Sequence, residues 1–253
     1  MKLPRNYFKA AIRGDRPQIG VWNTAGGNTI PEMLGGAGYD WVLVDCEHAA
    51  IETIEVINAL QAIGQFPETS ALVRPAANDP VLFKRLLDMG AQTLLVPYIE
   101  TAQEAAEAVR AMRYGPHGIR GMAGMTRATR YGQVEDYFTT AEQELCLIVQ
   151  VETVTGIGNL ADIARTDGVD GVFIGPADLS ASMGLVGQME HPEVDAVICD
   201  AIRKLVEMDV PVGVMALNPD TAKRYISLGA SFVAVAVDLV LLAKVLRDTR
   251  ELF

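Results

Sequence analysis

The sequence has few cysteines, and no pattern links them. Cys46, Cys146 and Cys199 are its three cysteines, and no two of them form a CxxC pair. An odd number of widely separated cysteines argues against a disulfide framework or a zinc knuckle, and it is typical of a reducing compartment. We therefore expect a cytoplasmic protein whose stability does not depend on disulfides.

Positive charge and long apolar segments are also scarce. The chain carries 21 Lys and Arg against 32 Asp and Glu, a net charge of −11 that repels nucleic acid and anionic membrane surfaces. The N-terminus lacks the apolar stretch of a signal peptide, and Asp238 and Lys244 interrupt the longest candidate for a membrane span. We expect a soluble protein with neither a nucleic-acid partner nor a membrane partner.

Hydrophobic residues, in contrast, are abundant. They make up 50% of the 253 residues, which is enough for a large core and leaves apolar surface for an interface between subunits. The composition therefore favours a homo-oligomer.

Eight apolar segments rich in β-forming residues recur along the chain, with helical patterns between them. They lie at 19–25, 41–48, 70–76, 93–100, 146–153, 171–178, 211–218 and 232–238. Strands that alternate with helices pair in parallel, with both faces of the sheet covered. Eight such units without a low-complexity linker predict an α/β fold, a (β/α)8 TIM barrel that spans residues 1–253 as a single domain.

The segment from Tyr114 to Glu144 departs from this regular spacing. It contains GPHGIRGMAGMTRATRYG and then a short predicted helix. A long loop after a strand-helix unit is usually functional or disordered, so this segment is a candidate cover for a site.

In a parallel barrel, functional groups gather at the carboxyl ends of the strands, because the strand-to-helix loops form one rim there. The stretch DCEH ends the second predicted strand and puts Asp45, Glu47 and His48 on this rim, and Arg74 ends the third. His48 beside two carboxylates is a candidate general base. Arg74 is a candidate for binding a carboxylate or stabilising a developing oxyanion.

Two further strands end in carboxylates. Gln150 and Glu152 share one face of the fifth predicted strand, and Asp178 follows the sixth. Two acids from adjacent strands, with positions left for water and substrate, suit Mg²⁺ or Mn²⁺. In the alternative interpretation, Glu152 pairs with an arginine and Asp178 caps the next helix. The other polar residues on the rim favour the metal.

Other motifs give weaker signals. GIGNLA at 156–161 matches the loose dinucleotide pattern, but two polar residues separate it from the preceding strand. The last two strands lack a Gly-rich phosphate cradle, and none of the six lysines stands at a predicted strand end. The sequence therefore argues against a phosphorylated substrate and against a Schiff-base mechanism.

Seven stretches together resemble the HpcH/HpaI family of metal-dependent 2-oxo acid aldolases, over nearly the whole chain. They are WVLVDCEHA, VRPAANDP, TLLVPYIE, GIRG, VQVET, VFIGPADLS and HPEV. The resemblance implies a (β/α)8 barrel, a divalent metal (Mg²⁺, Mn²⁺ or Co²⁺) and reversible aldol cleavage of 4-hydroxy-2-oxo acids to pyruvate or hydroxypyruvate and an aldehyde. It also implies a hexamer, a trimer of dimers, in which the last helix, LLAKVLRDTRELF, packs on a neighbouring subunit.

The resemblance also assigns roles to residues on the rim. By position, Glu152 and Asp178 would bind the metal, and Gln150 would support them. The backbone amides of Ala177 and Asp178 would bind the substrate carboxylate at a helix N-terminus.

The remaining roles concern the reaction itself. Arg74 would stabilise the enolate oxygen. His48 would move protons, directly or through a water on the metal, with Asp45 helping to orient it. Asp88, near the end of a predicted helix, should lie on the opposite face of its own barrel and would reach His48 only from another subunit. Met215 would border the aldehyde pocket.

Two other functions remain open on the sequence alone. A citrate-lyase-like carbon–carbon lyase would apply the same enolate chemistry to an acyl-CoA thioester, and the arginine-rich loop with Arg120, Arg127 and Arg130 is its candidate for binding coenzyme A. The third possibility is a non-catalytic barrel that binds metal and organic acids.

Overall fold

The computed structural model describes residues 1–253 and contains a closed barrel of eight parallel strands. The strands are β1 (Gln18–Asn23), β2 (Trp41–Asp45), β3 (Ser70–Arg74), β4 (Thr93–Val96), β5 (Cys146–Val151), β6 (Gly171–Ile174), β7 (Val212–Met215) and β8 (Phe232–Val237). Each strand pairs with the next in sequence, and β8 pairs with β1 to close the barrel. All eight predicted strands and the predicted TIM barrel are confirmed.

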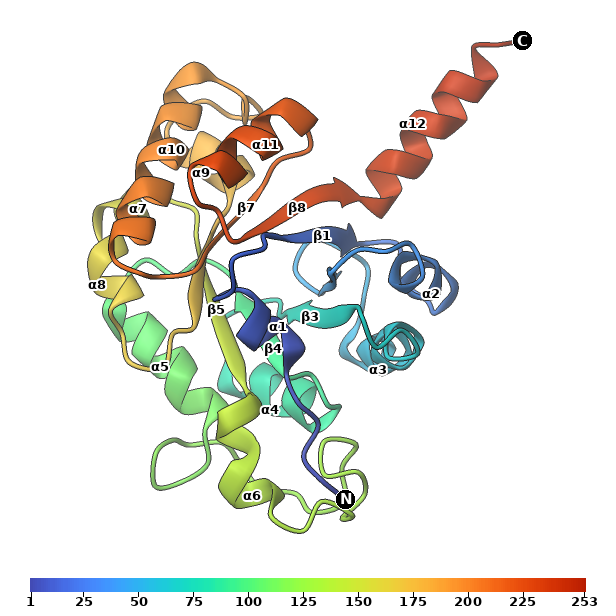
Figure 1. Cartoon of the computed structure of the whole chain (residues 1–253), viewed down its shortest axis with the longest axis vertical. Helices are drawn as coiled ribbons and strands as arrows, with labels where there is room; N and C mark the ends of the chain where they lie inside the picture. The colour runs from blue at the N-terminus through green and yellow to red at the C-terminus, as the bar shows by residue number, and fades with distance from the viewer.

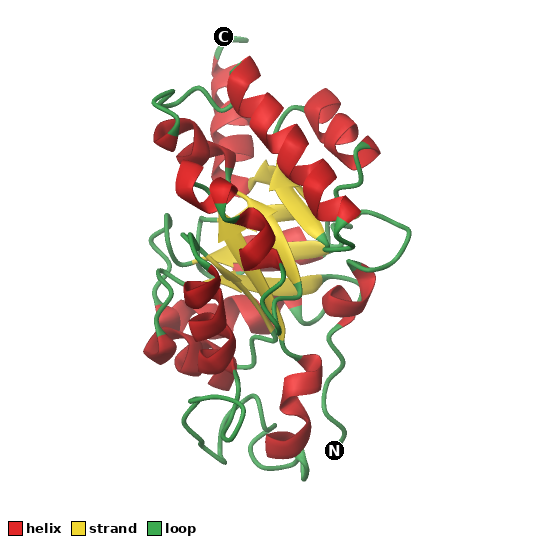
Figure 2. Cartoon of the chain, turned by 90° about the vertical axis from the view of Figure 1, so that its left-hand side faces the viewer, coloured by secondary structure: helices red, strands yellow, loops and turns green.

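Helices surround the strands, as Figure 2 shows in red around the yellow barrel. They are α1 (Tyr7–Ala11), α2 (Thr29–Gly35), α3 (Thr53–Ile63), α4 (Pro80–Asp88), α5 (Ala102–Met112), α6 (Tyr137–Thr140), α7 (Val154–Gly158), α8 (Leu160–Ala164), α9 (Pro176–Ser182), α10 (Pro192–Glu207), α11 (Pro219–Ser227) and α12 (Asp238–Arg250). A 3₁₀ turn at Ala141–Glu144 follows α6. None of these helices combines the length and the apolar character that crossing a membrane requires.

Local sequence explains where several of these helices begin. Asp79 caps α4 by accepting from the backbone N–H groups of Val81 and Leu82, and a proline occupies the first position of the helix. Thr101 and Glu104 form a reciprocal capping box at the start of α5. Such caps satisfy backbone donors that have no partner within the helix, so they set the point where each strand-to-helix loop ends.

Aromatic side chains fill the inside of the barrel. Trp22, Trp41, Phe173 and Phe232 belong to one buried cluster, and Phe8 of α1 packs on it from the amino-terminal end, 5.4 Å between ring centroids from Phe232. The outward-facing strand residues pack against the helices in a separate and larger cluster. Because α1 and these rings fill the interior at the amino-terminal end, the barrel is a solid core and not a pore.

Two strand glycines make room for these rings. A Cβ on Gly20 would lie 2.0 Å from the indole ring of Trp41, and one on Gly213 would lie 2.1 Å from the ring of Phe232. No side chain fits at either position unless an aromatic ring moves.

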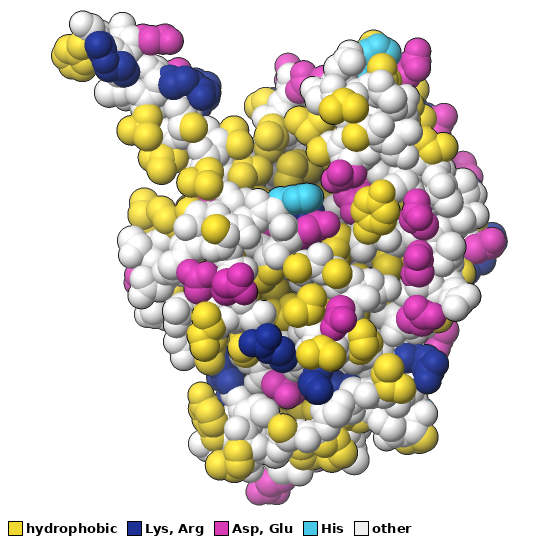
Figure 3. Space-filling view, turned by 180° about the vertical axis from the view of Figure 1, so that it is seen from behind, with side chains coloured by type: hydrophobic (Ala, Val, Ile, Leu, Met, Phe, Trp, Pro, Cys, Tyr) yellow, Lys and Arg dark blue, Asp and Glu magenta, His cyan; other side chains and the backbone are white.

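The last helix, α12, projects away from the barrel, as Figure 1 shows in red. Asp238 fixes its start by accepting from Asn23 Nδ2 at 2.8 Å and from Thr24 Oγ1 at 2.6 Å. After Asp238 the helix exposes large apolar side chains, namely Leu239, Val240, Leu241, Leu242, Val245 and Leu246. Figure 3 shows apolar surface, in yellow, on the projecting helix. The expectation that this helix packs on a neighbouring subunit stays a prediction.

The loop at 114–136 lies at the amino-terminal end of the barrel. Arg127 Nη1 donates to the carbonyl oxygen of Met89, and Ala128 N donates to that of Asp88, both at the end of α4. The loop therefore does not cover the carboxyl ends of the strands of its own barrel, and the expectation that it covers a site stays a prediction. The loop follows helix α5, and helices return the chain to the amino ends of the strands.

Replacing Gly20 by Ala should lower the stability of the protein by about 1–3 kcal/mol, because the methyl group would overlap the indole of Trp41. Thermal melting followed by circular dichroism measures this effect. Gly158→Ala is the matched control, since no atom lies within 4 Å of a Cβ built there. Equal melting temperatures for the two variants would show that the barrel interior adapts to the extra volume.

Candidate active site

A buried ion pair lies at the carboxyl ends of β2 and β3. Asp45 and Arg74 are register partners, and Arg74 donates from Nε and Nη2 to the two oxygens of Asp45, at 2.8 and 2.7 Å. The side chains are only 1% and 7% exposed. Burial raises the pKa of Asp45, but the hydrogen bonds and charge of Arg74 outweigh it, so that the net shift is downward. Asp45 therefore stays ionised and holds the guanidinium in one orientation.

Two further groups contact the same guanidinium. Its Cζ lies 5.4 Å from the ring centroid of Trp22, in a cation–π arrangement. On another edge, Nη1 lies 2.8 Å from Glu47 Oε2 as an ion pair. Sequence reasoning named Glu47 only as a neighbour of His48. The available signal was its two-residue spacing from Asp45.

His48 is exposed at the mouth of the site. Its side chain is 62% exposed, and its Nε2 lies 3.9 Å from Glu47 Oε2. We expected Asp45 to orient this imidazole, but the carboxylate of Asp45 instead binds Arg74 and accepts from the backbone N–H of Glu47. Asp45 therefore fixes the backbone at Glu47, the residue before His48, and Glu47 is the acid beside the imidazole ring.

Glu152 projects from the end of β5 into a buried position. Its Oε1 accepts from the backbone N–H of Tyr98, at 2.9 Å, and its Oε2 accepts from Gln150 Nε2. Tyr98 adopts the left-handed conformation, with φ 59°, which was not foreseen from the sequence. Burial raises the pKa of Glu152 to about 7, although these two hydrogen bonds act in the opposite direction.

The first residues of the stretch GPADLS form another wall of the site. A Cβ on Gly175 would lie 2.6 Å from Glu152 Oε2, so only glycine leaves the space beside this carboxylate open. Pro176 begins α9, and Asp178 lies in its first turn. The N–H groups of Ala177 and Asp178 are among the first of the helix, which have no acceptor within it.

These groups line a cavity of about 110 Å³. Seven of the predicted site residues are among those that line it: His48, Arg74, Gln150, Glu152, Ala177, Asp178 and Met215. Asp45 lies behind Arg74. Asp88 lies at the end of α4, where it accepts from Arg120 Nη2 at 2.7 Å, outside this cavity. The structure thus brings together every predicted site residue except Asp88, which we expected on the other face.

The residues present fit a divalent cation. The negative charges of Glu47 and Asp178 oppose ionisation of Glu152, and the buried Oε1 of Gln150 has no hydrogen-bond partner. A cation beside Glu152 would relieve both costs. The structure contains no group of three or more His, Cys, Asp or Glu side chains that could hold an ion. Glu152 and Asp178 would be the protein carboxylates that hold the cation, which leaves positions for substrate and water.

The fold and this cavity define a (β/α)8 barrel that holds a fixed arginine and buried carboxylates together at the carboxyl ends of its strands. Comparison with known proteins narrows this class. The family model described as HpcH/HpaI aldolase/citrate lyase matches residues 18–244. The chain belongs to this family.

Curated relatives and a solved structure are similar over nearly the full length. The pyruvate aldolase of Rhizobium etli is 51% identical, over 96% of this chain and 96% of the relative. The hydroxypyruvate/pyruvate aldolase of Sagittula stellata is 48% identical, over 96% and 95%. The 4-hydroxy-2-oxo-heptane-1,7-dioate aldolase of Escherichia coli is 50% identical, over 94% and 91%. The crystal structure of an HpcH/HpaI aldolase/citrate lyase family protein from Burkholderia cenocepacia has a TM-score of 0.93 and 38% identity, over 97% and 98%.

Glu152→Gln should change how the stability of the metal-free protein depends on pH. The pKa of Glu152 is about 7 in the folded protein, against an ordinary value of 4.5, so between these two pH values the folded protein keeps a proton that the unfolded chain has lost. The free energy of unfolding therefore falls by on the order of 3 kcal/mol as the pH rises through this range. The amide of the variant does not ionise, so this loss of stability should disappear. Melting temperatures at pH 5 and pH 8 test it. Glu207→Gln, at an exposed position of α10, should keep the wild-type pH dependence.

Proposed function

We propose that this chain catalyses the reversible aldol cleavage of 4-hydroxy-2-oxo acids, with pyruvate or hydroxypyruvate as the enolate donor and an aldehyde as the acceptor. The observation that carries the proposal is the guanidinium of Arg74, which Asp45 fixes on the wall of the cavity that also contains Glu152 and Asp178. The names of the relatives, all aldolases, support the same class of carbon–carbon lyase.

The residues act on two parts of the substrate. The N–H groups of Ala177 and Asp178 would bind the carboxylate of the 2-oxo acid. Arg74 would donate its remaining N–H groups to the oxygen at C2, where negative charge grows as the C3–C4 bond breaks. Because Asp45 already holds Arg74, the guanidinium does not need to reorient during the reaction. One such contact supplies about 3 kcal/mol of transition-state stabilisation.

A divalent cation, Mg²⁺, Mn²⁺ or Co²⁺, held by Glu152 and Asp178 would withdraw electron density from the 2-oxo group and so stabilise the enolate. Gln150 would keep Glu152 in place through its amide N–H. Gly175 would preserve the space beside the carboxylate that the ion needs.

His48 would move the protons. In the cleavage direction it takes the proton of the C4 hydroxyl, the O–H pair becomes the carbonyl of the aldehyde, and the C3–C4 pair passes into the enolate. A proton then adds at C3 to give the 2-oxo acid. Glu47 would hold the imidazole near the cavity from its position 3.9 Å away. Met215 would border the departing aldehyde, since it lines the same cavity.

The alternative functions receive less support. The basic residues considered for coenzyme A lie away from the cavity, because Arg127 binds the carbonyl of Met89 and Arg120 is buried against Asp88. Within one subunit, a citrate-lyase-like reaction on a thioester therefore lacks its expected cationic groove. A non-catalytic binding barrel would not explain why a buried acid fixes Arg74 so closely.

We further propose that the chain forms a homo-oligomer, a hexamer built as a trimer of dimers. The support is the apolar face of α12, which the barrel of the same chain does not cover. Large exposed apolar patches of this kind mark interfaces. Cys46, Cys146 and Cys199 are free, which supports a cytoplasmic location.

Asp88 would then act across a subunit interface. Arg120, whose side chain is 0% exposed, holds this carboxylate at the amino-terminal end of the barrel, where it can reach His48 only in another subunit. Asp88 would polarise the imidazole of that neighbour.

Pyruvate release from a 4-hydroxy-2-oxo acid tests the proposed reaction. Arg74→Gln should lower kcat/KM by roughly 10²- to 10³-fold, and Asp178→Ala should abolish turnover while circular dichroism shows a retained fold. Asp220→Asn, at an exposed position of α11, should leave the rate unchanged. Full turnover of Asp178→Ala in metal-free buffer would contradict the proposal.

Co-expression of two inactive variants tests the role of Asp88. Mixed oligomers of Asp88→Ala and Glu152→Ala should regain activity, because some sites combine an intact Glu152 with an intact Asp88 from the neighbour. Random mixing of equal amounts predicts about a quarter of the wild-type activity per site. Activity no higher than that of the separate variants would exclude a shared site.

A further inference from the structure

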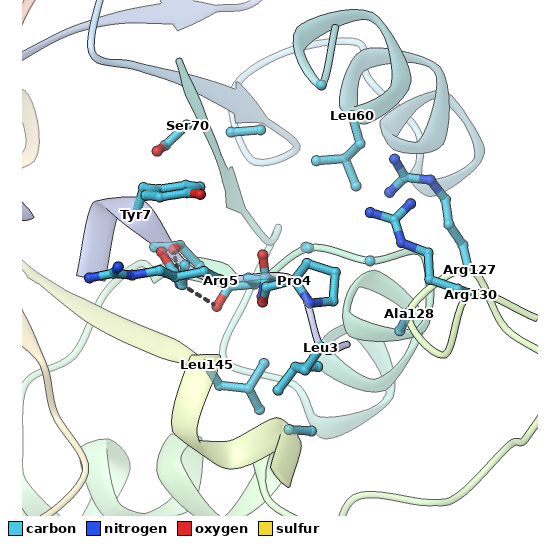
Figure 4. Close-up of a pocket in the computed structure, with 18 of the residues that line it drawn as sticks. Leu3, Pro4, Arg5, Tyr7, Leu60, Ser70, Arg127, Ala128, Arg130 and Leu145 are labelled. Atoms are coloured by element: carbon cyan, nitrogen blue, oxygen red, sulfur yellow. Dashed lines mark hydrogen bonds between the residues drawn. The ribbon is translucent and has the colours of Figure 1, made fainter. Parts of the chain in front are cut away.

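A second cavity lies at the amino-terminal end of the barrel, away from the candidate active site, and Figure 4 shows it in close-up. Its volume is about 270 Å³, near the lower end of the range for ligand pockets, roughly 300–1,000 Å³. The segment before α1, the loops that precede β3 and β4, and the loop between α5 and α6 form its walls. It shares no residue with the active-site cavity.

The charge that lines this cavity is exclusively positive. Arg5, Arg127 and Arg130 line it, and no Asp or Glu does. The chain as a whole has the opposite balance, with a net charge of −11. A concave surface of one sign concentrates ligands of the other sign, so this cavity favours anions.

Two of the arginines lie side by side. Figure 4 shows the guanidinium groups of Arg127 and Arg130 together beside Leu60, whereas Arg5 extends toward the other end of the cavity. Neither Arg127 nor Arg130 forms an ion pair with a carboxylate. Burial and the neighbouring charge of Arg130 lower the pKa of Arg127. The protein thus holds two like charges together without supplying a counter-ion.

The side chain of Arg127 and the backbone of Arg130 are held in place by their surroundings. Arg127 Nη1 donates to the carbonyl of Met89 at 2.9 Å, and its guanidinium occupies the space that a Cβ on Gly90 would take, 2.6 Å from Nη1. Arg130 has a left-handed backbone with φ 51°, in a turn that the hydroxyl of Thr129 closes by donating to Gly124 O at 2.7 Å. The remaining N–H donors of Arg127 are therefore pre-organised for a ligand, and the guanidinium of Arg130 lies beside them.

We propose that Arg127 and Arg130 form a binding site for a small multivalent oxyanion, a phosphate or an organic acid with two or more carboxylates. Two planar guanidinium groups match such oxygens with several charge-assisted hydrogen bonds. Leu60 and Pro4, beside the pair, would contact the apolar part of an organic anion. Bound there, the anion joins the loop between α5 and α6 to the N-terminal segment. This site is independent of the proposed aldolase reaction.

Binding of inorganic phosphate and of tricarballylate, measured by thermal shift and isothermal calorimetry at constant ionic strength, tests the proposal. At least one of them should raise the melting temperature of the wild-type protein. Arg127→Gln/Arg130→Gln should weaken that binding by at least roughly tenfold. The probe that binds with the higher affinity shows whether the site prefers phosphate or carboxylates. Arg165→Gln, at an exposed arginine without an ion pair, is the matched control and should bind like the wild type.

Arg130→Gln alone keeps the test valid if the double variant does not fold, because Arg130 is exposed. Equal binding by wild type and variant would overturn the proposal, since the anion would then occupy another site. Absence of binding to the wild type would overturn it as well. A change in oligomeric state of the variant without any anion effect would mean that the arginines face an acidic surface of a second copy, and would also overturn it.

Discussion

The buried ion pair between Arg74 and Asp45 is the interaction on which the rest of the site depends. It joins two neighbouring strands at their carboxyl ends, and the side chains of both partners are buried. Removal of either partner would leave a buried charge without compensation, which is far more costly than the absence of the pair. Glu47 and Trp22 then complete the surroundings of the guanidinium, so one cation is presented to the cavity in a single orientation.

Around this cation the barrel gathers more negative charge than it can neutralise. Burial and the charge of Asp178 raise the pKa of both Glu47 and Glu152, and the charge of Arg74 offsets only part of this effect at Glu47. Gly175 keeps open the space beside Glu152. This combination of surplus anionic charge, an unpaired amide oxygen and room for an ion would be the physical basis for the proposed metal-assisted enolate chemistry. The chain belongs to the HpcH/HpaI aldolase/citrate lyase family.

The two ends of the barrel have opposite electrostatic character. The carboxyl ends of the strands collect acids around one arginine, whereas the amino ends carry a cavity with arginines and no acid. Each end also bears a feature that the isolated chain leaves incomplete. At one end α12 exposes an apolar face, and at the other Asp88 is held by Arg120 beyond the reach of its own site. Association of subunits would complete both.

The sequence by itself determined the eight strands, the barrel and most of the rim. Apolar runs and turn residues are local signals, and residues at the carboxyl end of any strand in a closed parallel barrel must share one face. Only the tertiary structure decided the partners of these residues. In the structure Asp45 binds Arg74 instead of the ring of His48, and the backbone N–H of Tyr98 donates to Glu152. The loop at 114–136 lies at the amino-terminal end of the barrel. Each of these contacts joins segments distant in sequence, and their geometry depends on packing and chain direction, which local patterns do not encode.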